Sequence, residues 1–209
     1  MNQNVRVFKK RLQIAQKKWN TVQAHSIRTV NIILNIISRL NLVQNPNVFS
    51  EELLTKFEDI PERLSYHLAE LINSSIINLN NFIGQFSDII KEMRKIEQQF
   101  RVDFSLIARK QVMEENKVSF HDIEIIEQAE NTIQMIVDMY ETELALKKQL
   151  IMEIQNSPSF QPLMITAYLV LWSSEIYIES ERINELIEEF TFAEKISLDQ
   201  ISKRSSNSF

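Results

Sequence analysis

The amino-acid sequence predicts an all-α protein: an elongated antiparallel helical bundle or coiled coil with long helices and a short C-terminal helical pair. Three observations lead to this prediction. Only one of the 209 residues is glycine, so the tight turns of a sheet protein lack the residue that usually builds them. The four prolines lie where helices should start or stop. Apolar residues recur at alternating spacings of three and four, which is typical of a helical seam.

The first helix is predicted over about 5–41, and Asn45-Pro46-Asn47 ends it. Its seam contains two polar positions, Ser26 and Thr29, which we expect to fix the register or to face a partner. A short helix follows over about 50–59, with Ser50 as its N-cap. The full seam reads Phe8, Leu12, Ala15, Trp19, Val22, Ser26, Thr29, Ile33, Ile36 and Leu40.

The second long helix is predicted over about 62–111. If continuous, it would be roughly 75 Å long at ~1.5 Å per residue, too long for a compact domain of this size. We therefore expect either an elongated molecule or a bend near Asn80, Asn81 and Gly84, where helix propensity is weakest.

The third long helix is predicted over about 119–155, opened by a capping box that begins at Ser119. Ser157-Pro158 ends it and matches a minimal proline-directed phosphorylation site. Short helices follow over about 162–173 and 180–200, and residues 202–209 are predicted to be a disordered tail. With no repeat at a solenoid period, residues 1–201 are expected to form a single elongated helical unit.

Charge is unevenly distributed along the chain. Residues 1–50 contain eight basic and no acidic residues, although the whole chain has a net charge of −5. The basic segment should lie against acidic helices of the same chain, an acidic partner or nucleic acid, and pairing with acidic protein is favoured. No apolar run approaches the ~20 residues of a membrane span. The basic residues are Arg6, Lys9, Lys10, Arg11, Lys17, Lys18, Arg28 and Arg39.

The residue types that carry chemistry do not form a recognisable site. The absence of cysteine excludes disulfides and thiolate catalysis, and a single glycine excludes a phosphate-binding loop. His25, His67 and His121 each stand alone, without a second ligand at helical spacing. We therefore expect no cofactor, no metal and no enzymatic activity.

Three charged residues lie in or near the seams. Glu97 interrupts the second seam, while Glu130 and Lys147 lie near the third. Each is either a buried charge facing a partner or an edge residue exposed to solvent, and the edge position is the commoner arrangement.

Three stretches carry a resemblance to a known family. They are Lys18-Trp19-x-Thr21-Val22 continuing to Thr29-x-Asn31, the run from Met139-Tyr140 to Lys147-Lys148, and Tyr168-Leu169-x-x-Trp172 followed by Tyr177-Ile178-Glu179-Ser180. In order and spacing the chain resembles the cyclin-dependent kinase 2-interacting protein family. The resemblance covers these short stretches, and residues 45–135 match only as helix.

The resemblance implies a non-catalytic adaptor of the nucleus. Its implied partners are a cyclin-dependent kinase, a second replication-origin kinase and a AAA ATPase complex. The helical seams themselves predict a further partner, a helical subunit that bundles with the long helices. The implied processes are the cell cycle, cell division, DNA replication, the DNA damage checkpoint and ribosome biogenesis. No membrane partner is implied, and direct binding of nucleic acid is not expected.

Aromatic anchors often dominate protein-binding surfaces, so the expected partner-binding residues are mainly aromatic. Core packing is the alternative role for each of them. The candidates are Trp19, Tyr140, Tyr168, Trp172, Tyr177 and Glu179.

Other functions stay open at this point. The basic N-terminal helix could serve a nucleic-acid-binding accessory factor, and the seams could serve a generic coiled-coil structural subunit. A carboxylate site inside the bundle would instead make the protein an enzyme.

Overall fold

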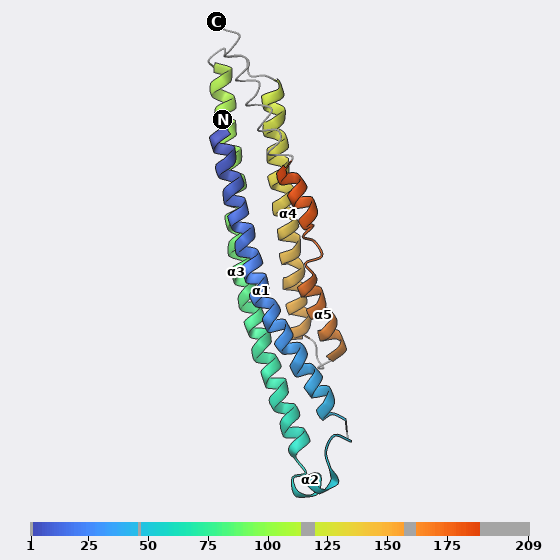
Figure 1. Ribbon diagram of the computed structural model, residues 1–209. Helices are drawn as coiled ribbons and strands as arrows, with labels where there is room; N and C mark the ends of the chain where they lie inside the picture. The colour runs from blue at the N-terminus through green and yellow to red at the C-terminus, as the bar shows by residue number, and fades with distance from the viewer. Residues whose placement is uncertain (1, 46, 114–119, 157–161, 189–209) are drawn as a thin grey trace. The chain divides into compact units, whose positions relative to one another are not determined.

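The computed structural model describes residues 2–45, 47–113, 120–156 and 162–188 (Figure 1). These residues are helical apart from short connections and contain no strand, which confirms the all-α prediction. Residues 180–188 form a helical stretch after the fifth labelled helix. The labelled helices are α1 (Asn2–Val43), α2 (Glu51–Lys56), α3 (Ile60–Met113), α4 (Phe120–Asn156) and α5 (Pro162–Ser174).

The short helix α2 shows how local sequence sets helix ends. Ser50 is its N-cap as predicted, and the Ser50 hydroxyl accepts a hydrogen bond from the Leu53 backbone N–H at 3.3 Å. The helix ends at Lys56, earlier than expected, because Phe57 leaves the helical region at φ −143° and ψ 72°. Pro61 lies in the first turn of α3, where its missing N–H is tolerated. None of the residues of α2 is buried.

The weak-propensity segment of α3 does not interrupt the helix, which continues through Asn80, Asn81 and Gly84. A Cβ atom added at Gly84 would meet nothing within 4 Å. No packing contact among the described residues therefore requires a glycine there.

Several predictions fall outside the described residues. They concern the capping box at Ser119, the phosphorylation site at Ser157, the last helix beyond residue 188 and the tail over 202–209. Within the described residues, no helix combines the length and the apolar composition needed to cross a bilayer.

The described residues pack as two compact units. Among the described residues, unit 1 is drawn from 2–18, 88–113, 120–143 and 177–188, and unit 2 from 19–45, 47–87, 144–156 and 162–176. The helices α1, α3 and α4 each supply residues to both units. A single elongated unit over 1–201 stays a prediction.

In unit 1, neighbouring long helices run antiparallel. Phe8 of α1 packs edge-on against Phe100 of α3 at 5.3 Å between ring centroids, and Lys18 of α1 reaches Glu92 earlier in α3. Residues at seam spacing fill the core, as the sequence predicted, because one stripe of each helix faces its neighbours. Its buried apolar residues include Phe8, Leu12, Met93, Ile96, Phe100, Ile133, Ile136, Tyr140, Ile183 and Leu186.

In unit 2, α5 packs with α1, α3 and α4. Pro162 opens α5, and the buried Ile165, Leu169 and Trp172 lie at spacings of four and three. These three side chains form one face of the helix. The other buried residues of this core include Trp19, Val30, Ile33, Leu68, Ile72, Ile76, Leu79, Phe86, Leu150, Ile151 and Ile154.

Candidate functional site

Three of the six predicted partner-binding residues are buried within the chain. Trp19 and Trp172 are 0% and 1% exposed in unit 2, and Tyr140 is 3% exposed in unit 1. Phe86 lies 4.3 Å from Trp19 and 6.4 Å from Trp172 between ring centroids, so it joins the two indole rings. These three residues take the core position that the sequence left as the alternative.

The other three predicted residues are accessible to different degrees. Tyr168 on α5 is partly buried, while Tyr177 and Glu179 are exposed in the connection that follows α5. The Tyr177 backbone N–H donates to the Glu143 carboxylate at 3.2 Å, which ties this connection to α4 within unit 1. Partner binding by any of the six residues stays a prediction.

The buried end of α5 is held by a polar network that sequence reasoning only partly anticipated. The Trp172 indole N–H donates to the Ser26 hydroxyl at 2.9 Å. The Gln23 side-chain amide donates to the Trp172 carbonyl at 3.1 Å, and the Ser26 hydroxyl donates to the Gln23 carbonyl at 2.9 Å. Ser26 was expected to fix the register of the first helix or to face a partner. Its contact with Trp172 is within the chain and fixes the register of α1 against α5. Gln23 was missed.

Lys147 is fully buried in unit 2, contrary to the favoured expectation of an edge position. Its ammonium donates to the Trp172 carbonyl at 2.7 Å and lies 5.0 Å and 5.6 Å from the ring centroids of Trp172 and Phe86. A buried cation requires such partners, because an unsolvated charge is otherwise very unfavourable. The Trp172 carbonyl is near the end of α5, where helix carbonyls lack partners in the helix itself.

Glu175 directly follows the last residue of α5 and has a φ angle of 45°. It is the one non-glycine residue with a positive φ angle among those that the structure describes. Its carboxylate accepts a hydrogen bond from the Trp19 indole N–H at 2.6 Å. This left-handed conformation is unfavourable for a residue with a side chain. The contact with Trp19 is therefore part of what holds the backbone in this conformation at the end of α5.

Unit 1 contains a charged network between α3 and α4. The Arg94 guanidinium donates to both carboxylate oxygens of Glu141, with Nε to Oε1 at 2.6 Å, and to Asp138 at 2.8 Å. Arg94 also pairs with Glu97 at 2.6 Å, and Arg101 pairs with Glu97 at 3.1 Å. Glu97 is 4% exposed, so the edge position favoured for it was also wrong.

The same network affects the pKa of Arg94 and extends to a further carboxylate, that of Glu130. The hydrogen bond that Arg94 donates to Glu141 is the largest cause that raises the pKa of Arg94 above its ordinary value; burial opposes this rise, while the hydrogen bonds to Glu97 and Asp138 add to it. Arg101 Nε contacts Glu130 at 2.6 Å, and Glu130 is partly exposed. Because guanidinium groups engage these carboxylates, the network is suited to fixing the register of α3 against α4.

Neither unit gathers a metal site from its described residues, where no group of His, Asp and Glu side chains converges in that way. His25 and His67 are exposed, and the side chain of His121 lies outside the described residues.

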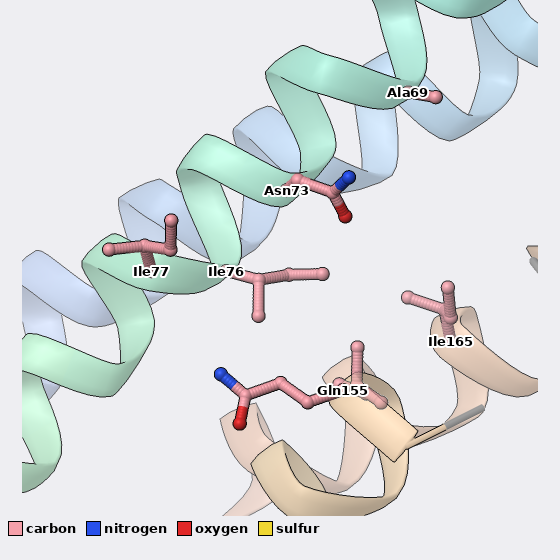
Figure 2. Close-up of a pocket in the computed structure, with 7 residues that line it drawn as sticks. Ala69, Asn73, Ile76, Ile77, Gln155 and Ile165 are labelled. Carbon is pink, nitrogen blue, oxygen red and sulfur yellow. The ribbon is translucent and has the colours of Figure 1, made fainter. Parts of the chain in front are cut away.

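Unit 2 has a cavity of about 330 Å³ between α3, α4 and α5 (Figure 2). Five of its seven lining residues have aliphatic side chains and two have side-chain amides, and the sequence gave no indication of it. The lining residues are Ala69, Asn73, Ile76, Ile77, Ile154, Gln155 and Ile165.

Residues 1–196 match the family described as "Ribosome biogenesis protein C1orf109-like". The chain belongs to this family. No curated protein matches the chain.

Family membership corrects the resemblance to the cyclin-dependent kinase 2-interacting protein family, which was wrong. The predicted role as a cell-cycle and replication adaptor is also wrong. So are the predicted partners: the two kinases, the helical partner subunit and the AAA ATPase complex. Of the implied processes, ribosome biogenesis agrees with the family, whereas the cell cycle, DNA replication and DNA damage find no support. The alternatives of a nucleic-acid-binding factor or a generic coiled-coil subunit gain no support either.

The structure supplies a physical reason for the mistake. Much of what carried the resemblance is core: Trp19, Tyr140, Leu144, Leu169 and Trp172 are all buried. Large apolar residues at helical spacing are needed by any bundle that packs short helices on long ones. Such a pattern therefore does not identify a family.

Proposed function

We propose that the protein acts in ribosome biogenesis as a non-catalytic binding protein and that it works in the nucleus. The observation that carries this proposal is the family match over residues 1–196, which includes residues of both units. Nuclear localisation is part of the proposal because early ribosome assembly takes place in that compartment.

The contacts of the charged groups support a role without catalysis. Lys147 is directed at a backbone carbonyl and two aromatic rings, and Arg94 is directed at three carboxylates. A general acid or base would instead face a site that can admit a substrate. The cavity of unit 2 has no ionisable group in its lining, so it offers nothing to transfer a proton.

The proposal is tested by graded depletion of the protein in cells of its own organism. Ribosome biogenesis predicts accumulation of unprocessed ribosomal RNA precursors and a changed ratio of free small and large subunits on a sucrose gradient. Restoring the protein should restore both. Normal precursors and a normal subunit profile after complete depletion would contradict a role in ribosome assembly.

The same depletion separates a binding protein from a catalyst. A stoichiometric component should give a defect that grows in proportion to the protein lost, whereas a catalyst should sustain assembly until little of it remains. A fluorescent fusion that complements the depletion tests localisation, and exclusion of that fusion from the nucleus would refute this part of the proposal.

A further inference from the structure

The cavity of unit 2 has an aliphatic floor and a neutral polar rim. Ile76, Ile154 and Ile165 are buried, and Figure 2 shows Ile76 and Ile165 pointing toward each other from α3 and α5. Asn73 and Gln155, both exposed, project from α3 and α4 (Figure 2). No charged side chain is part of the lining.

These properties restrict the chemistry of an occupant. A charged group would lose hydration in the cavity and find no counter-charge. An aliphatic group would gain from leaving water against three isoleucines. Each rim amide offers both a carbonyl acceptor and N–H donors, which is the pairing that a peptide unit needs.

The surroundings of the cavity indicate an occupant larger than a small molecule. Tyr66, Asn73 and Ile77 are separated by seven and four residues, so they lie along one face of α3 together with Glu70, which hydrogen-bonds Tyr66. Tyr66 is 67% exposed and Ile77 is 60% exposed, although both are large and largely apolar. The strip from Tyr66 to Ile77 extends about 16 Å at ~1.5 Å per residue, the length of about five residues of extended chain.

We propose that this cavity binds one aliphatic side chain of a partner polypeptide, and that Asn73 and Gln155 hydrogen-bond the backbone amides on either side of that side chain. The flanking residues of the partner lie along the strip formed by Tyr66, Asn73 and Ile77. The proposal rests on the geometry of unit 2 and does not depend on the proposed function.

The test uses the purified full chain, labelled with ¹⁵N in its amides and ¹³C in its isoleucine methyl groups. N-acetyl-leucine N-methylamide is the probe, since it presents one aliphatic side chain between two neutral amides. We expect saturable shifts of the Asn73 and Gln155 side-chain amides and of the Ile76 and Ile165 methyl groups, with a Kd of about 1 mM for a ligand of this size. An alanine pentapeptide with a central leucine should bind about tenfold more tightly, because it also covers the strip.

Matched ligands distinguish the possible occupants. The capped lysine and glutamate analogues should give no saturable shift. Isopentanol has the same aliphatic group without amides. It should bind at least tenfold more weakly than N-acetyl-leucine N-methylamide, because it cannot make the hydrogen bonds to both rim amides that the two amide groups of that probe make. Equal binding of isopentanol, or of a charged analogue, would overturn the proposal. If the same amide and methyl signals shift with protein concentration in the absence of any ligand, the occupant is a second copy of the chain. That result would also overturn the proposal.

Variants connect the binding to the cavity. Ala69→Met adds a side chain to the lining and should weaken pentapeptide binding at least tenfold. Ala167→Met places the same change on an exposed position of α5 outside the lining and should leave binding unchanged. If Ala69→Met fails to fold, Gln155→Ala at the exposed rim replaces it and should weaken binding severalfold. Wild-type affinity in a folded Ala69→Met protein, or in Gln155→Ala, would contradict the proposal.

Discussion

The hydrogen bond between Trp172 and Ser26 provides a quantitative test of how unit 2 is held together. Trp172→Phe removes the indole N–H and leaves the Ser26 hydroxyl, which is 0% exposed, without its donor. Ser26→Ala removes the acceptor and leaves the buried N–H without a partner. Each orphaned group should lower the free energy of unfolding by about 1–3 kcal/mol. The smaller phenylalanine ring should add roughly 1–2 kcal/mol in the first variant, because it leaves a void.

The double variant separates the hydrogen bond from these other effects. With both partners removed, neither polar group is left alone, so the double variant should be more stable than the sum of the single changes predicts, by about 1–2 kcal/mol. The hydrogen bond from Ser26 to the Gln23 carbonyl is lost in both proteins that carry Ser26→Ala, so it cancels in the comparison.

The assay is urea unfolding of all four proteins, followed by far-ultraviolet circular dichroism and by tryptophan fluorescence. The fluorescence comes from Trp19 and Trp172 in the wild type and in Ser26→Ala, and from Trp19 alone in the two proteins that carry Trp172→Phe. Equal dependence of the unfolding free energy on urea concentration would show that the same structure is being unfolded in each protein. Additivity of the two changes within ~0.5 kcal/mol would refute the reasoning, because it would mean that the two side chains do not interact in the folded chain.

Three further predictions concern α3. Gly84→Ala should raise the free energy of unfolding by about 1 kcal/mol, since the added Cβ meets nothing within 4 Å; a decrease in urea unfolding would contradict the helix at this residue. Arg94→Met should lower that free energy by about 2 kcal/mol because it leaves the buried partner carboxylate with one cation fewer. Arg63→Met, in an exposed pair with 81% of its side chain accessible, should change it by no more than about 0.5 kcal/mol, and equal effects of the two would argue against the network. The pKa of Tyr66 is raised above 10.0 chiefly by its hydrogen bond with Glu70, so Glu70→Gln should lower the pH at which this tyrosine ionises in an ultraviolet titration, with Tyr66→Phe identifying its signal.

The helices and their buried stripes could be predicted from the sequence because they depend on local spacing. Phe8, Leu12, Ala15 and Trp19 are buried as their seam positions predict. The pairing of Glu97 with two arginines could also have been found, since Arg94 and Arg101 lie three residues before and four residues after it. That spacing places both guanidiniums on the glutamate.

The contacts that distinguish this chain from other bundles could not be predicted in the same way. Burial of Lys147 depends on the carbonyl of Trp172, 25 residues away, and on the ring of Phe86 on another helix. The cavity likewise depends on how three helices meet. Local periodicity determines which stripe of a helix is covered, but it does not determine which segment covers it.

The interleaving of the chain between the units limits how the protein can be dissected. Unit 1 draws on three separate stretches of sequence and unit 2 on two, and the boundaries fall inside α1, α3 and α4. Truncating the gene at a point inside α1, α3 or α4 would therefore strip residues from both cores or leave one of them incomplete. Fragment expression and two-hybrid truncation series, which assume that a stretch of gene encodes a folded piece, are expected to yield insoluble products here. Point substitutions in the intact chain are the appropriate tool for mapping its surfaces.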